Sequence, residues 1–293
     1  MAFNCSRRAH DKWESGNCVS VVGRDVSGGD PLVVTLSLPG GQSLNLTSSP
    51  MDTLCQYVVG SVAEGAGGQV FTPNVDQLVQ ASKRPDLFSL LTWASVRVPD
   101  GMPLVWSSRL QRKPLLRRIS GSDLIWEIAR EAADSAVPVF LLGGRPGSAA
   151  AASAAMRMAF PSLAVTGAHC PRLGFEQRTS EMTALLTQLE SKEPMIVFCG
   201  LGFPKQERLI SHLYSVHPQH GYIACGAAID FAGGAVRRAP LAMRQFGAEW
   251  LYRLYREPCR LARRYLIRDV PYTFKLLLHS VLNGLLNRGD TCE

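Results

Sequence analysis

The sequence predicts an α/β protein, with a Rossmann-like parallel sheet that has helices on both faces and a basic helical appendage at the carboxyl end. From Gly68 onward, apolar runs of strand length alternate with helical patterns, which is typical of a parallel sheet. Several runs stop at glycine-rich turns, as buried strands do before a helix. The segment from Arg237 to Arg268 holds nine arginines, two glutamates and no lysine, so it carries the whole net charge of +7.

The predicted elements alternate in chain order. The strands are expected at residues 69–72, 95–98, 138–142, 163–167, 195–199 and 222–226. The helices are expected at residues 75–81, 102–110, 121–135, 148–160 and 176–191, with one more beginning at Gln206. For the helix at 121–135, Ser122 or Asp123 is the expected N-cap. The resulting order of strands and helices predicts a sheet covered on both sides.

The sequence predicts that the chain divides into three segments of different character. Residues 1–67 contain short β-rich stretches between Gly-Gly and Ser-Pro breaks and are interpreted as an irregular leader or small β-rich segment. Residues 68–236 are expected to form the main α/β domain, and residues 237–293 a basic amphipathic helical appendage for membrane association. The apolar stretch 270–286 is interrupted by Pro271, Lys275, His279 and Asn283, so we expect a surface-lying helix instead of a bilayer span.

The amino-acid composition indicates which kind of protein this is and in which compartment it is expected. A chain of 293 residues that is 46% hydrophobic can bury a sizeable core. The eight cysteines are scattered without a Cys-x-x-Cys pair, so neither a disulfide framework nor a zinc site is indicated. We expect a reduced, cytosolic protein without a signal peptide, soluble or peripheral to a membrane. The arginines alternate with aromatic and aliphatic residues, which favours an anionic membrane surface over nucleic acid, with an intramolecular or oligomer contact as the other reading.

Polar and glycine-rich loops follow four of the predicted strands. In open α/β sheets ligands bind beyond the carboxyl ends of the strands, so the loops should converge on one site. Gly200 and Gly202 would let the backbone approach a phosphate, and the helix beginning near Lys205 would point N–H groups at it. Turn formation alone also explains these glycines, and helix capping also explains Asn74 and Asp100. The loops are Thr72–Asn74, Pro99–Gly101, Gly200–Glu207 and Gly226–Gly234.

These loops resemble the WecG/TagA/CpsF family of bacterial glycosyltransferases, glycosyltransferase family 26. The resemblance runs from about Gln69 to about Arg264 and rests on ordered motifs. They are Thr72-Pro-Asn74, Asp100-Gly101, Leu141-Leu-Gly-Gly144, Gly200-Leu-Gly-Phe-Pro-Lys-Gln-Glu207, Gly226-Ala-Ala-Ile-Asp-Phe-Ala-Gly-Gly234, Arg237-Arg-Ala-Pro240 and Glu249-Trp-Leu-Tyr-Arg-Leu254.

The resemblance implies an inverting transferase that moves a hexose or N-acetylhexosamine-type sugar from a UDP-sugar to a saccharide on undecaprenyl pyrophosphate, in exopolysaccharide or other surface-glycan synthesis. It implies no metal or other cofactor, and the chain has no Asp-x-Asp metal clamp. It makes Asp100 the base that deprotonates the acceptor, with Thr72, Asn74 and Gln206 at the catalytic centre. The implied substrate-binding residues are Gly143, Gly200, Gly202, Pro204, Lys205, Glu207, Gly226 and Asp230. The implied lipid or pyrophosphate contacts are Arg237, Arg238, Arg244, Arg253 and Arg256, on the inner face of the cell membrane.

Two differences from the family pattern keep a second reading open. No further glycine stands near Met102 or Pro103, and Gly167–Phe175 extends a turn that is usually compact in the family. The alternative is therefore a membrane-associated nucleotide-sugar binding or scaffold protein without activity. An NAD-dependent oxidoreductase is disfavoured because no Gly-x-Gly-x-x-Gly follows the first strand. The apolar appendage is also compatible with self-association.

Overall fold

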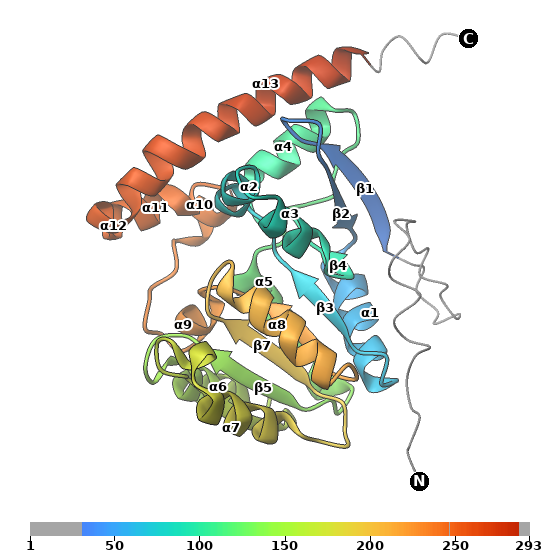
Figure 1. Cartoon of the computed structure of the whole chain (residues 1–293), viewed down its shortest axis with the longest axis vertical. Helices are drawn as coiled ribbons and strands as arrows, with labels where there is room; N and C mark the ends of the chain where they lie inside the picture. Colours follow the sequence, from blue (N-terminus) through green and yellow to red (C-terminus); the bar gives the residue numbers. More distant parts are fainter. Residues whose placement is uncertain (1–30, 246, 287–293) are drawn as a thin grey trace. The chain divides into compact units, whose positions relative to one another are not determined.

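A six-stranded parallel sheet forms the centre of the protein (Figure 1). The computed structural model describes residues 31–245 and 247–286. The strand order is β4-β3-β8-β7-β5-β6, and every neighbouring pair is parallel. The strands are β3 (Gly68–Phe71), β4 (Val96–Arg97), β5 (Val139–Gly143), β6 (Val165–His169), β7 (Ile196–Gly200) and β8 (Gly221–Ala224). All six carboxyl ends consequently meet at one edge of the sheet.

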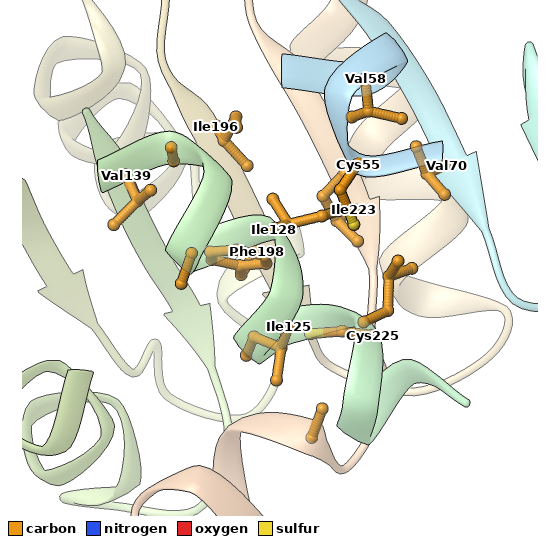
Figure 2. Close-up of a cluster of buried hydrophobic side chains, with 14 of the residues drawn as sticks. Cys55, Val58, Val70, Ile125, Ile128, Val139, Ile196, Phe198, Ile223 and Cys225 are labelled. Carbon is orange, nitrogen blue, oxygen red and sulfur yellow. The ribbon is translucent and has the colours of Figure 1, made fainter. Parts of the chain in front are cut away.

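Two apolar layers cover the two faces of the sheet. One face packs against α1 (Met51–Ala63), α5 (Gly121–Asp134), α6 (Ser148–Ala159) and the short α9 (Ala228–Ala232). Figure 2 shows this layer, where side chains of α1 and α5 point at Phe198 and Ile223 of the sheet. The opposite face packs against α7 (Thr179–Leu189) and α8 (Lys205–Val216). Along β5, Val139 and Leu141 join the first layer while Phe140 and Leu142 join the second, as strand geometry requires.

A third apolar cluster lies beside the sheet. It joins an antiparallel hairpin to three helices of the first half of the chain and to Leu276 of the last helix. These elements are β1 (Leu32–Ser37), β2 (Ser43–Ser48), α2 (Val75–Ala81), α3 (Pro85–Thr92), α4 (Met102–Leu110) and α13 (Val270–Leu286). Between the sheet and α13 the chain forms α10 (Leu241–Gln245), α11 (Glu249–Arg256), α12 (Pro258–Ala262) and a π-helical segment (Arg263–Asp269).

Helix α13 runs along α4 (Figure 1), and small and polar residues of α13 face α4. The hydroxyl of Ser280 is buried against Ser107, and it accepts from Gln111 Nε2 at 3.0 Å. A Cβ on Gly284 would lie 2.1 Å from the Leu110 carbonyl oxygen, so only glycine fits this crossing. The outward side is apolar and exposed, comprising Phe274, Leu278, Val281, Leu282, Leu285 and Leu286. No helix in the described part of the chain is long and apolar enough to cross a bilayer.

The predicted fold class is confirmed, and most predicted elements lie within a few residues of the observed ones. The expectation of an irregular segment before residue 68 is wrong for residues 51–63, which form α1 in the core, whereas residues 1–30 lie outside the described residues. The helix expected at 176–191 begins later, as α7 at Thr179, after a 3₁₀ turn at Phe175–Gln177. The N-cap of α5 is Ser120, whose hydroxyl accepts the Asp123 N–H. The division at residues 67 and 236 stays a prediction.

Candidate active site

A cleft of about 950 Å³ runs along the carboxyl edge of the sheet, and we call it the main cleft. Its volume lies in the range of ordinary ligand sites. All six strands contribute through the loops that follow them, and one lining residue from each is Thr72, Asp100, Gly144, Cys170, Gly200 and Gly226. The four loops singled out in the sequence therefore meet at one edge of the sheet.

Asp100 lies where the main cleft meets a second cavity of about 320 Å³, the side pocket, because it lines both. Its backbone N–H donates to the Pro73 carbonyl at 2.9 Å, which ties the loop after β4 to the loop after β3. The N-cap of α4 is Gly101 and receives no side-chain cap, so Asp100 does not serve as a helix cap. The Asp100 residue is partly buried and lines both cavities.

Burial raises the pKa of Asp100 to about 6, against the opposing effect of the Arg118 and Arg253 guanidinium groups. Glu249 adds to the increase through its negative charge. A carboxylate with a pKa near 6 is still ionised at neutral pH and accepts a proton more readily than an ordinary aspartate. The environment of Asp100 therefore suits a general base.

Gln206 connects two of the glycine-rich loops. Its Oε1 accepts the N–H of Gly202 at 3.2 Å and the N–H of Gly226 at 3.1 Å, and its Nε2 donates to Glu207 Oε1 at 2.9 Å. The Gly202 and Gly226 N–H groups are thus bonded to Gln206 and are not free to bind a ligand. An amide nitrogen carries two N–H groups, so one remains for a ligand in the main cleft that Gln206 lines.

Glu207 lies behind Gln206 and lines neither cavity. It is fully buried, its Oε2 has no hydrogen-bond partner, and burial raises its pKa to about 7. The bond from Gln206 Nε2 fixes which end of the Gln206 amide points at the loops, because the amide oxygen must then turn toward the two backbone N–H groups. The position of Glu207 is that of a residue that orients Gln206.

Thr72 and Asn74 line the main cleft from the loop after β3. The Thr72 hydroxyl donates to the Ala224 carbonyl of β8 at 3.1 Å, which leaves the lone pairs of its oxygen for other partners. Asn74 Oδ1 accepts the Gln77 N–H at 3.1 Å, so Asn74 is the N-cap of α2. The capping role suggested by the sequence is confirmed, and it holds Asn74 rigidly beside Asp100, where both residues line both cavities.

The appendage arginines divide into two groups. Arg253 lines both cavities, and its guanidinium lies 5.2 Å from the centre of the Phe231 ring. Arg238 and Arg244 instead pair with Asp123, at 2.8 Å and 3.6 Å, and line neither cavity. Exposed Arg237 and Arg256 also lie outside both linings. Of the five arginines singled out in the sequence, the structure brings one to the cavities.

The remaining predicted binding residues occupy varied positions. Lys205 and Asp230 line the main cleft, and Asp230 Oδ1 accepts the Arg145 N–H at 2.7 Å. Gly143 and Pro204 are not among the lining residues. Gly143 has a φ of +108°, and a Cβ there would lie 2.6 Å from the Gly200 carbonyl oxygen, so close packing of β5 on β7 requires glycine.

Two arginines of the site were not singled out as site residues in the sequence. Arg264 lines both cavities and pairs with Asp76 at 3.2 Å, and Arg118 lines the side pocket and pairs with Glu249 at 3.7 Å. The loop from Cys170 to Glu176 also lines the main cleft, and most of it falls in the stretch Gly167–Phe175 that the sequence marked as longer than the family pattern. The arginine-rich composition of 237–268 included Arg264, but no local signal separated it from its solvent-facing neighbours.

A parallel sheet with a cleft across the carboxyl ends of its strands is typical of nucleotide-binding α/β enzymes. The sequence model of the Glycosyl transferase WecG/TagA/CpsF family matches residues 42–284. Because that match covers far more than half of the chain, the protein belongs to the WecG/TagA/CpsF family and is a glycosyltransferase. The family places it in cell-surface glycan synthesis, where such an enzyme binds a nucleotide sugar and a lipid-linked acceptor.

Proposed function

We propose that this protein transfers a hexose or N-acetylhexosamine-type sugar, with inversion and without a metal ion, from a UDP-sugar to a saccharide on undecaprenyl pyrophosphate. The observation that carries the proposal is the position of Asp100 at the junction of two cavities. A transferase must bring two substrates to one base, and a carboxylate shared by two adjoining cavities suits that requirement.

The main cleft suits the donor. It extends across the whole sheet edge, as an elongated nucleotide sugar requires, and its centre consists of the glycine-rich loops after β7 and β8. Lys205 lines the cleft beside these loops, and Arg253 and Arg264 line it from the appendage. These side chains can donate charge-assisted hydrogen bonds to the two phosphates and to the leaving UDP, and in the structure Lys205 also pairs with Glu176 and Arg264 with Asp76. Charge stabilisation by arginine and lysine is the basis for proposing a metal-independent reaction.

The side pocket suits the acceptor saccharide. Trp106, Trp250, Tyr265 and Phe274 line it, and aromatic rings pack well against the apolar faces of sugar rings. Arg253 and Arg264 stand where the side pocket adjoins the main cleft, so the same charges can contact the acceptor pyrophosphate. An acceptor in this pocket would present its hydroxyl to Asp100.

The proposed reaction is a single displacement. The acceptor O–H gives its proton to the Asp100 carboxylate as the oxygen forms a bond with the anomeric carbon of the donor. The bond from that carbon to the phosphate oxygen breaks, and UDP leaves with the electron pair. Attack from the face opposite the leaving phosphate inverts the anomeric configuration. The free N–H group of Gln206 can donate to the donor during this step.

We also propose that the appendage rests on the anionic inner face of the cell membrane. Helix α13 buries its small and polar side and exposes its apolar side, and Leu278 and Leu286 are 64% and 73% exposed. An apolar outer face suits the hydrocarbon boundary, while nearby arginines suit anionic headgroups. We expect Leu278→Asp to lower the affinity of the protein for anionic phospholipid vesicles, measured by co-sedimentation, by about tenfold or more. Leu116→Asp, at an exposed leucine outside both cavities, is the control, and equal losses in both variants would contradict a role for α13.

The test of the catalytic proposal is UDP release by the purified protein with a panel of UDP-sugars and an undecaprenyl-pyrophosphate-linked saccharide, with and without EDTA. We expect release that depends on the acceptor, persists in EDTA and is lost in Asp100→Asn. The anomeric configuration of the product, read by NMR, tests inversion. Binding of UDP-sugars without turnover on any acceptor would support the alternative of an inactive binding or scaffold protein. Size-exclusion chromatography with and without vesicles tests self-association through the exposed apolar face.

A further inference from the structure

The loop after β6 forms the end of the main cleft farthest from Asp100. Consecutive residues from Cys170 to Glu176 line the cleft there. Leu173 at the apex of this loop is 90% exposed while it lines the cleft. The protein covers only a small part of this large apolar side chain, and a ligand in the cleft would cover more of it.

The two ends of this loop are anchored. The Cys170 thiol donates to the Gly144 carbonyl oxygen at 3.0 Å, and Phe175 is buried in the apolar layer under α7 and α8. Glu176 pairs with Lys205 at the start of α8 at 3.0 Å. Gly174 turns the chain with a φ of +80°. The anchors hold the apex at the rim of the cleft, so Leu173 has a defined place beside a bound ligand.

Strand order sets how a donor lies in the cleft. In the sheet, β3 and β6 are separated by β8, β7 and β5, and four steps between neighbouring strands span about 19 Å. The reacting sugar must lie beside Asp100, at the end of the cleft that β3 and β4 form. The diphosphate then lies over the loops after β8 and β7, beside Lys205. The nucleoside is left for the end that the loops after β5 and β6 enclose.

We propose that the loop from Cys170 to Gly174 forms the nucleoside subsite, with Leu173 packed on one face of the donor's base. This inference rests on the proposed function, because the direction of the donor follows from Asp100 acting as the base. Arg145, on the loop after β5, bounds the same end of the cleft and is held by Asp230 and by Glu257 of the appendage. The subsite therefore has walls from two strands, and Leu173 supplies its apolar cover.

The test compares Leu173→Ala with the wild-type protein in donor binding and turnover. Removing most of a leucine side chain from contact with a base should weaken UDP binding by about tenfold. The Michaelis constant for the UDP-sugar should rise by about the same factor while kcat stays unchanged, because the lost contact is equal in the ground state and the transition state. The substitution lies on an exposed side chain, so thermal unfolding should not change.

Leu116→Ala is the matched control, because Leu116 is 59% exposed and lines neither cavity. Leu173→Phe, which keeps an apolar cover, should restore UDP affinity. Wild-type affinity for UDP in Leu173→Ala would overturn the proposal, as would a fall in kcat at an unchanged Michaelis constant, since that would place Leu173 at the reacting end. If the wild-type protein itself binds no UDP-sugar, the proposed donor is wrong, and this outcome is separate from a failure of Leu173 alone.

Discussion

Replacing Asp100 with asparagine should abolish most of the activity and at the same time stabilise the fold at neutral pH. The carboxyl group is partly enclosed, and burial raises its pKa from the ordinary 3.8 to about 6. Its ionised form is therefore less favourable in the folded protein than in the unfolded chain. Asparagine has nearly the same shape and carries no charge, so it removes this unfavourable term together with the proposed base.

The pKa difference sets the size of the effect. A rise of about two in pKa corresponds to about 3 kcal/mol in the free energy of unfolding. This value is an upper limit, because water in the cleft reaches the carboxylate and screens it. Between about pH 4 and pH 6 the folded protein holds a proton on Asp100 that the unfolded chain has lost, so wild-type stability falls as the pH rises. Above about pH 6 Asp100 is ionised in both states, and it causes no further fall in stability.

The assay is urea unfolding of both proteins across pH 3.5 to about 8, at concentrations where unfolding is reversible. Relative to the wild-type protein, the free energy of unfolding of Asp100→Asn should be slightly higher near pH 4. The difference should increase between pH 4 and pH 6 and reach at most about 3 kcal/mol at pH 7. Asp134→Asn serves as control, because Asp134 is exposed on α5 and lines neither cavity. Its difference from wild type should show no comparable increase between pH 4 and pH 6.

Activity is measured on the same samples as acceptor-dependent UDP release. Loss of a general base typically lowers the rate by about 10² to 10⁴. In the wild-type protein, kcat/KM should rise with pH through about 6, as Asp100 loses its proton. Full activity in the variant would refute the proposed base. An equal free energy of unfolding for both proteins at pH 7 would refute the inference that the ionised Asp100 carboxylate destabilises the folded protein.

Three further predictions concern residues around Asp100. Gln206→Leu leaves the Gly202 and Gly226 N–H groups without their acceptor and should lower the free energy of unfolding by about 2 kcal/mol. An unchanged stability in urea would contradict the role of Gln206 in holding the two loops together. Glu207→Gln should stabilise the protein at pH 8 but not at pH 4. The buried Glu207 carboxyl has a pKa of about 7, so the free energy of unfolding of the wild-type protein falls as the pH rises toward 7. Differential scanning calorimetry of both proteins at pH 4 and pH 8 checks this prediction. Arg253→Ala should raise the Michaelis constant for the UDP-sugar at least tenfold, whereas Arg117→Ala, an exposed arginine outside both cavities, should not; equal kinetics in the two variants would remove Arg253 from the site.

Local sequence patterns predicted the elements well where one residue's neighbours decide its conformation. The helix expected at 102–110 is α4, and the stretch 270–286 is α13, with the same limits. Helix α1 was missed because Val58, Val59 and Val62 and an internal Gly60 are weak helix formers. Its stability comes from packing against α5 and the sheet, which a pattern of nearby residues does not contain.

The sequence by itself determined the sheet, the ends of its strands and hence the edge where Thr72, Asp100 and Gln206 meet, because strand periods and glycine turns are local. The tertiary structure decided which arginines reach the cavities, since Arg253 and Arg264 line them while Arg238 and Arg244 pair with Asp123. It also decided the roles within the Gln206–Glu207 pair and the place of the loop at Cys170–Glu176. Each of these depends on contacts between residues far apart in the chain, and only the packed fold sets the distances and the burial that fix them.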